Sequence, residues 1–241
     1  MPILQKDGRS ILFIHVPKAG GSAVERLFKA SGYTSSVATL DGTVGPGTVN
    51  DLRRCTPQHM HAELLRVNFQ LHKFDAIFMV VRDPIERFRS EYLWRNRQDG
   101  ASVAADAVEA WGLDRLRRYR RYTYLDDNHI RPQWQFRTTG AVVYKLENTL
   151  EAAFADLNDR HSLGLELDVP RVRSSHDHSG RSSADVEISD RLRKALTQFY
   201  YRDYVEFGYA HEPVAVTDRI RMRTSRFEQV ARSGYRALRA F

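Results

Sequence analysis

The sequence contains a single cysteine, Cys55, among 241 residues. One thiol excludes an internal disulfide and any zinc cluster built on cysteines, which suits a reducing cytosol. No window approaches the roughly 18 uncharged apolar residues of a membrane span, and the amino terminus lacks the apolar run of a signal peptide. The sequence also lacks internal repeats and low-complexity segments. We therefore expect a cytoplasmic protein.

The composition is that of an ordinary globular protein, with 42% hydrophobic and 28% charged residues. A chain of 241 residues is long enough for one α/β domain with a sizeable core and too short for two comfortable ones. We expect one domain over residues 1–210, followed by a basic amphipathic extension over residues 211–241.

The formal charge of +7 is concentrated in that extension, because residues 219–241 hold seven arginines and one glutamate. The remaining chain is nearly neutral, so the charge gives no reason to expect a nucleic-acid partner. Apolar residues in the segment recur at helical spacing. Such a helix either packs on its own domain or on a second subunit, or it lies on an anionic membrane surface.

The most informative stretch is residues 11–22, which reads ILFIHVPKAGGS. Ile11–Val16 predicts a buried strand, and Ala23–Ala30 predicts a helix with an apolar face. The glycine-rich turn between them directs backbone N–H groups, and the positive end of the helix dipole, toward one spot that favours an anion. Lys18 adds a positive charge. The stretch is typical of a phosphate-binding loop; the alternative is a tight turn with a solvated lysine.

A second polar element follows the apolar run Phe74–Val81, which predicts another buried strand. Arg82 comes directly after it, and the following amphipathic helix carries Ser90. The planar guanidinium of arginine can make two charge-assisted bonds to one phosphate. Taken alone, Arg82 is better explained by an ion pair with Asp83 or Glu86. Both polar elements, however, lie at the carboxyl ends of predicted strands, where open α/β sheets bind ligands.

The order Pro-Lys-x-Gly-Gly-Ser differs from the nucleotide triphosphate loop, in which Gly-Lys-[Ser/Thr] comes last. It resembles the 5′-phosphosulfate loop of sulfotransferases that use 3′-phosphoadenosine 5′-phosphosulfate (PAPS), especially the carbohydrate-modifying branch. The stretch V-R-D-P-x-x-R-x-x-S resembles the element that grips the 3′-phosphate in these enzymes, and Y-K-L-E-N at residues 144–148 is typical of the same branch. The resemblance covers residues 10–210 and suggests a bacterial enzyme.

The resemblance implies a P-loop-kinase-like sulfotransferase fold: a single α/β domain with a central parallel sheet flanked by helices. It also implies which residues bind the donor nucleotide: Lys18, Ala19, Gly20, Gly21, Ser22, Ala23, Arg82, Ser90 and Arg181. His129 and Gln133, from an element similar to the family's H-x-x-P-Q, are expected to contact the acceptor. Lys18 is also expected to act in catalysis by stabilising the phosphate leaving group, and no metal is required.

The acceptor hydroxyl needs a base that titrates near neutrality, which favours histidine. His59-Met60-His61 resembles the His-x-His element of the uronyl 2-O-sulfotransferases, in which the second histidine carries this role. We therefore predict His61 as the base, with His59 as its neighbour or substitute. The alternatives are two surface histidines or a zinc pair, and spacing places no third ligand. His176 and His178 form a rival pair in a predicted lid over the nucleotide.

Together these features predict an enzyme that transfers sulfate from PAPS to a saccharide or glycolipid hydroxyl. A P-loop-type kinase that uses ATP is an alternative from the same architecture, although the position of the lysine counts against it. A second alternative is a non-catalytic basic binding module that depends on the arginine-rich extension. With a lipid-linked acceptor, the extension would hold a cytoplasmic enzyme at the inner membrane face.

Overall fold

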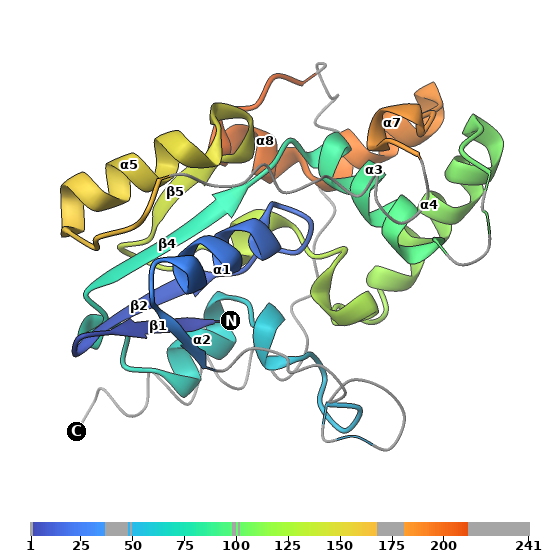
Figure 1. The fold of residues 1–241 in the computed structure, drawn as a ribbon. Helices are drawn as coiled ribbons and strands as arrows, with labels where there is room; N and C mark the ends of the chain where they lie inside the picture. Colours follow the sequence, from blue (N-terminus) through green and yellow to red (C-terminus); the bar gives the residue numbers. More distant parts are fainter. Residues whose placement is uncertain are drawn as a thin grey trace.

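The computed structural model describes residues 2–36, 48, 50–97, 100, 102–167 and 181–211. Within these ranges the strands form one five-stranded sheet in the order β3–β1–β2–β4–β5 (Figure 1). Their bounds are β1 Ile3–Lys6, β2 Arg9–Ile14, β3 Thr34–Ser36, β4 Ala76–Val81 and β5 Val142–Lys145. The strands β2, β4 and β5 run parallel, as the sequence predicts. Their carboxyl ends therefore meet at one edge of the sheet.

The sheet is mixed rather than parallel throughout, because β1 and β3 add to it as antiparallel strands. The cause is local. Asp7 and Gly8 join β1 to β2 with φ values of 50° and 77°, and a two-residue Asp-Gly loop with positive φ at both positions favours a tight hairpin. This hairpin is a feature that the prediction of a parallel sheet missed.

Helices of the described segments cover both faces of the sheet and form a lobe beside it. The longer ones are α1 Gly21–Ala30, α2 Ala62–Asn68, α3 Pro84–Arg95, α4 Ala105–Tyr119, α5 Leu150–His161, α7 Asp190–Phe199 and α8 Tyr201–Phe207. The short 3₁₀ turns are η1 Pro57–His59, η2 Leu71–Lys73, η3 Leu125–Asn128, η4 Gln133–Phe136, η5 Leu146–Asn148 and η6 Ser183–Asp185. No helix of the described residues is long and apolar enough to span a membrane.

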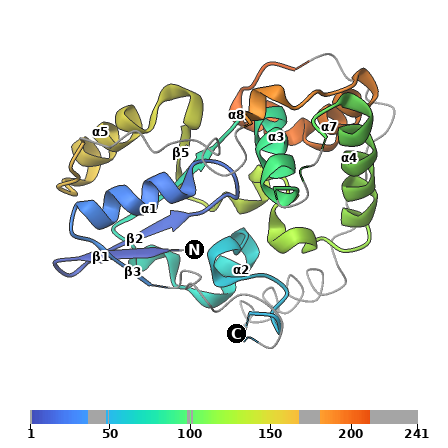
Figure 2. The same ribbon diagram turned by 45° about the vertical axis from the view of Figure 1, so that its right-hand side comes forward.

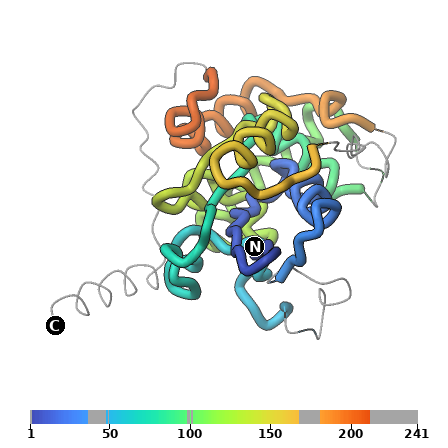
Figure 3. Tube along the Cα trace, turned by 60° about the vertical axis from the view of Figure 1, so that its left-hand side comes forward, coloured from blue at the N-terminus to red at the C-terminus, as the bar shows by residue number. Residues whose placement is uncertain are grey.

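Alternate residues of the strands supply two separate cores, because side chains along a strand point to opposite faces. Phe13 and Phe78 stack on one face and pack with Phe28 of α1 and Phe154 of α5, so these two helices lie on the same side of the sheet (Figures 1 and 3). The other face packs on α2, η4 and α8.

A third core joins α3, α4, α7 and α8 into the helical lobe at the end of the sheet (Figure 2). The sequence predicts one helix over residues 188–207, but the structure divides it into α7 and α8. At the junction, Tyr200 leaves the helical conformation with ψ at 14°, and its buried hydroxyl donates to the Ile130 carbonyl oxygen. Gly208 ends α8 in the left-handed conformation. The predicted extension lies outside the described residues, apart from His211.

Candidate active site

The loop between β2 and α1 forms an anion cradle at the carboxyl edge of the sheet. Lys18 and Gly20 both have positive φ, 65° and 86°, and Gly20 is the N-cap of α1. Among the described residues, none accepts a hydrogen bond from the backbone N–H groups of Gly21 and Ser22. Unpaired N–H groups at the positive end of a helix dipole bind phosphate and sulfate groups.

Position 21 also requires glycine for a steric reason. A Cβ atom at this position would lie 2.0 Å from Nε2 of His15, so only glycine lets the start of α1 pass over the imidazole. The Nδ1 atom of His15 lies 3.0 Å from Oε1 of Glu25 and 3.0 Å from Nε2 of Gln58. Burial lowers the pKa of His15, and the Glu25 carboxylate opposes that shift. The His15 ring thus lies directly against Gly21 at the start of α1.

Positive charge gathers around Lys18. Its Nζ atom lies 5.2 Å from the ring centre of Trp94, which also faces the guanidinium groups of Arg95 and Arg97 at 4.7 and 4.6 Å. Burial lowers the pKa of Lys18 to about 8, with the nearby arginines Arg82, Arg97 and Arg95 adding to the shift and Glu91 opposing it. A bound polyanion would relieve this crowding of like charges.

Arg82 lies at the end of β4, near Lys18, as the sequence predicts. Its guanidinium is 3.8 Å from the Glu86 carboxylate. The Arg82 backbone is clamped by Gln133, whose Oε1 accepts from the Arg82 N–H at 3.0 Å and whose Nε2 donates to the Arg82 carbonyl oxygen at 2.8 Å. Gln133 also bonds the buried carboxylate of Asp203. These bonds make Gln133 a support for Arg82, whereas the sequence suggests an acceptor contact.

Two further expected nucleotide residues are Ser90, which lies on α3, and Arg181, which precedes η6. The Asp83 carboxylate caps α3 by accepting from the N–H groups of Ile85 and Glu86. Ser90 is buried one turn before Trp94. Arg181 lies near Tyr92, where its charge acts to lower the pKa of that phenol against the effect of burial. His176 and His178 lie outside the described residues.

Three imidazoles, which we call the histidine cluster, line up beside the cradle: His15, His59 and His129. The ring centres of His15 and His59 are 5.1 Å apart and those of His59 and His129 are 4.8 Å apart, both edge to face. His129 also stacks on Trp94 at 5.0 Å. The cluster therefore touches the cradle twice, through His15 beneath Gly21 and through Trp94 beside Lys18.

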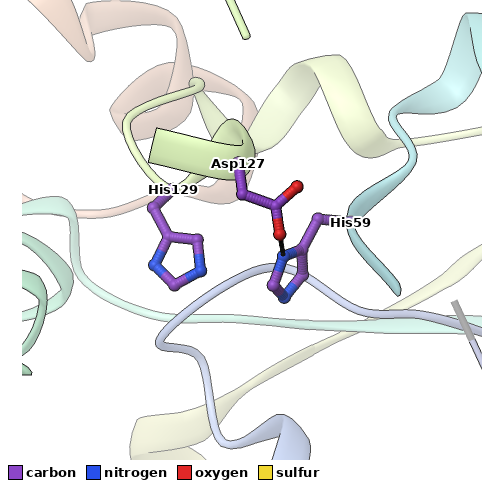
Figure 4. Close-up of side chains that lie close together, drawn as sticks. All are labelled: His59, Asp127 and His129. Carbon is purple, nitrogen blue, oxygen red and sulfur yellow. Dashed lines mark hydrogen bonds and ion pairs between the residues drawn. The ribbon is translucent and has the colours of Figure 1, made fainter. Parts of the chain in front are cut away.

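Each imidazole of the cluster has its own carboxylate at Nδ1. The partners are Glu25 for His15 at 3.0 Å, Asp127 for His59 at 2.7 Å and Glu91 for His129 at 2.6 Å. Figure 4 shows the central pair with His129 beside it. Burial lowers the pKa of His59 to about 3 although Asp127 opposes the shift. His59 is therefore neutral at pH 7, and the Asp127 carboxylate is the neighbouring group that favours its protonation.

Possible metal ligand atoms of His59, Asp127 and His129 lie within 4.8 Å of one another. Of the histidine pair considered from the sequence, this set includes His59 but not His61. However, the Asp127 oxygens already accept from His59 and Thr56, so the carboxylate lies behind the imidazole, at Nδ1 and not at Nε2. The arrangement fits an oriented imidazole better than a ligand set.

His61 lies in different surroundings, at the start of α2. It is buried, and its Nε2 is 3.4 Å from the Tyr124 hydroxyl. It lines a cavity of about 510 Å³ together with Arg66, Arg131 and Trp134, and the lining includes no residue of the cradle. Burial lowers the pKa of His61 to about 3, and the charges of Arg131 and Arg66 add to the shift. The structure thus places His59, but not His61, in the histidine cluster.

Several residues of the site carry no motif in our sequence analysis. Glu91 and Trp94 follow Ser90 by one and four positions on α3. His15 directly precedes the cradle. Asp127 gives no sequence signal, because its role depends on a turn that the residue types do not predict.

The mixed α/β sheet, with the loop from β2 to α1 at its carboxyl edge, is consistent with a P-loop-like domain. A model of the sulfotransferase family matches residues 1–210, and the chain therefore belongs to that family. No curated protein and no solved structure matches the chain significantly. The enzyme class is accordingly a transferase of sulfuryl groups that requires an acceptor substrate.

Proposed function

We propose that the protein transfers a sulfuryl group from PAPS to a hydroxyl of a saccharide or glycolipid. The observation that carries the proposal is the cradle, where N–H groups of α1 that bond to no described residue meet a half-buried lysine with a lowered pKa. The site is thus preformed for a polyanion and is charged before the ligand arrives. The resemblance of its loop to the 5′-phosphosulfate loop makes PAPS the donor.

The donor residues divide into two groups at neighbouring strand ends. The N–H groups of Gly21 and Ser22 and the ammonium of Lys18 would hold the phosphosulfate, which supplies an activated S–O bond when bound. Arg82, held in place by Gln133, would take the 3′-phosphate with Ser90. Both groups lie at the carboxyl edge shared by the parallel strands β2 and β4, so one nucleotide can reach both.

His59 is the base of this proposal. The acceptor oxygen attacks sulfur, its O–H bond breaks with the proton going to Nε2 of His59, and the S–O bond to the phosphate breaks with its electrons staying on the phosphate oxygen. Lys18 stabilises that developing charge. Asp127 stabilises the imidazolium that forms, because its carboxylate contacts Nδ1. His129, whose ring lies 4.8 Å from that of His59, would contact the acceptor.

The alternative base is His61, which the sequence favours. Its surroundings oppose that role, because Arg131 and Arg66 disfavour an imidazolium whereas Asp127 favours one at His59. The cavity beside His61 also shares no lining residue with the cradle, and a base must lie within hydrogen-bond reach of the attacking oxygen.

Thermal stabilisation by two nucleotides tests the donor assignment. We expect 3′-phosphoadenosine 5′-phosphate to raise the melting temperature without magnesium, because ligands that bind only the folded state stabilise it. ATP with magnesium serves as the control for a kinase. Stabilisation by ATP with magnesium alone would refute PAPS as the donor, and transfer of labelled sulfate to a panel of glycans and glycolipids would identify the acceptor.

We also propose a domain boundary near residue 210. The family match ends there, and Gly208 closes α8. Truncation after Asp218 should therefore leave sulfate transfer to a soluble acceptor intact. If residues 219–241 hold a cytoplasmic enzyme on the inner face of an anionic membrane, the same truncation should abolish binding of the protein to anionic vesicles at low salt. Loss of folding would instead make the extension part of the domain.

A further inference from the structure

Three consecutive residues before His129 adopt a conformation that is rare outside glycine. Asp126, Asp127 and Asn128 have φ values of 51°, 56° and 65°. The left-handed region is unfavourable for L-residues, with Asn and Asp the best tolerated, and runs of it are uncommon. Such a turn persists only when the surrounding contacts hold it, and it marks places where geometry matters for function.

Two of the three side chains, those of Asp127 and Asn128, bond to the segment that carries His59. The Asp127 carboxylate accepts from the Thr56 backbone N–H at 2.6 Å, from the Thr56 hydroxyl at 2.7 Å and from Nδ1 of His59 at 2.7 Å. The next residue, Asn128, donates from Nδ2 to the His59 carbonyl oxygen at 2.8 Å. Arg131 holds the Asn128 side chain in turn, at 3.0 Å. The turn thus fixes both the main chain and the ring of His59.

We infer that Asp127, oriented by Thr56, is a positioning residue that locks His59 in the tautomer with the proton on Nδ1 and the lone pair on Nε2. An ionised carboxylate can only accept hydrogen bonds, so the Nδ1 atom facing it must carry the hydrogen. Burial raises the pKa of Asp127, but the bonds to His59 and Thr56 outweigh burial and hold the pKa below its usual value, which keeps the carboxylate ionised. The inference rests on the proposed role of His59 as base, since only this tautomer can take a proton at Nε2.

The two bonds from Thr56 determine the orientation that an amide would take in place of the carboxylate. In Asp127→Asn, the Thr56 backbone N–H requires an acceptor, so the amide oxygen takes the position of Oδ1. The amide NH₂ group then occupies the position of Oδ2 and donates to the Thr56 hydroxyl and to Nδ1 of His59. Since Nδ1 must now accept, the imidazole proton moves to Nε2, and the ring can no longer act as a base there.

Nitrogen NMR of the full-length protein labelled with ¹⁵N-histidine tests this directly. We expect His59, assigned by comparison with His59→Gln, to be protonated at Nδ1 in the wild-type protein at pH 7 and at Nε2 in Asp127→Asn. A wild-type His59 protonated at Nε2 would overturn the inference without the need for any variant. An unchanged tautomer in folded Asp127→Asn would overturn it as well.

Two further variants separate the carboxylate from the turn. Asp127→Gly keeps a residue suited to the left-handed conformation and should leave His59 in a mixture of tautomers. Asp126→Asn changes the neighbouring carboxylate, which faces Arg115 and Arg95, and should leave the His59 tautomer as in the wild type. A tautomer change in Asp126→Asn but not in Asp127→Gly would contradict the assignment to Asp127.

Activity on the acceptor found in the panel gives a second readout. Asp127→Asn should lower kcat by about 10³- to 10⁴-fold, as in other Asp–His pairs with the tautomer reversed, with the KM for PAPS unchanged. Asp127→Gly should lose less. The Nδ1-protonated tautomer in a protein that transfers no sulfate would support the inference and refute the proposed function. Sulfate transfer by a wild-type protein with Nε2-protonated His59 would refute the inference and support the proposed function.

Discussion

His59 and His61 are separated by one residue and lie in two different environments. His59 ends η1 within the histidine cluster and has a carboxylate at Nδ1, whereas His61 begins α2 beside a tyrosine hydroxyl and a cavity lined with arginines. Burial lowers the pKa of both to about 3. The difference lies in the charged partner: Asp127 can stabilise an imidazolium at His59, and Arg131 and Arg66 oppose one at His61. Burial alone therefore does not identify a base.

Replacing each histidine in turn gives the largest expected contrast. His59→Gln should lower the turnover of sulfate transfer by about 10²- to 10⁴-fold, because loss of a general base commonly has this effect. Affinity for 3′-phosphoadenosine 5′-phosphate should stay nearly unchanged, since the base acts on the acceptor. The matched variant His61→Gln should keep most of the turnover. Steady-state kinetics with labelled PAPS would reverse the assignment if His61→Gln were the inactive variant.

The lysine of the cradle should come next. Lys18→Ala removes a phosphate contact and the charge that stabilises the leaving group, so turnover should fall by about 10²-fold or more. Lys29→Ala, an exposed change at the other end of α1, is the control and should have little effect. Equal turnover of the Lys18→Ala protein and the wild type would remove Lys18 from the mechanism.

Arg82 should affect binding more than chemistry. Arg82→Ala should weaken the binding of 3′-phosphoadenosine 5′-phosphate by about 2 to 3 kcal/mol if the charged bond to the 3′-phosphate is buried. The exposed Arg191, which pairs with Glu109, offers a control variant without this loss. Calorimetry that finds the wild type binding a nucleotide without the 3′-phosphate equally well would contradict the assignment.

The pH dependence of stability should show the smallest effect. The folded-state pKa values of His59 and His61 lie far below the ordinary histidine value of 6.5, so the unfolded chain binds more protons, and stability falls as pH drops from 6.5 toward 3. Each such histidine contributes a slope of about 1.4 kcal/mol per pH unit. His61→Gln should reduce the slope measured by urea unfolding between pH 6.5 and 4.5, whereas the exposed His72→Gln should not. Identical slopes for wild type and His61→Gln would show that His61 is not buried as a neutral group.

The main features of the fold follow from local signals. The apolar runs Ile11–Val16 and Phe74–Val81 predict β2 and β4 because a strand covered on both faces needs continuous apolar residues. Gly20 predicts the turn into α1 because the backbone there has a positive φ, which glycine adopts readily. The hairpin of β1 and β2 was missed although Asp7-Gly8 is a strong hairpin signal. The break at Tyr200 was unpredictable, since it depends on a bond to the distant Ile130 carbonyl.

The site is less accessible to sequence reasoning because it is assembled from distant segments. A spacing of two between histidines fixes no common direction here, since Met60 and His61 are extended after the 3₁₀ turn, with ψ values of 132° and 172°. Asp127 meets His59 only through a turn of three left-handed residues, which Asp-Asp-Asn does not specify. Gln133 looks like a binding residue in the sequence and is a clamp on the Arg82 backbone in the structure.

The most direct test of the account is whether the nucleotide site and the histidine cluster are one site. The measurement is the change in imidazole ¹⁵N signals of the ¹⁵N-histidine-labelled full-length protein on addition of 3′-phosphoadenosine 5′-phosphate. Signals of His15, His59 and His129 should shift, because these rings contact the cradle through Gly21 and Trp94, and the His61 signal should stay. A shift of the His61 signal with the other three unchanged would place the donor nucleotide in the cavity lined by His61 and contradict the account.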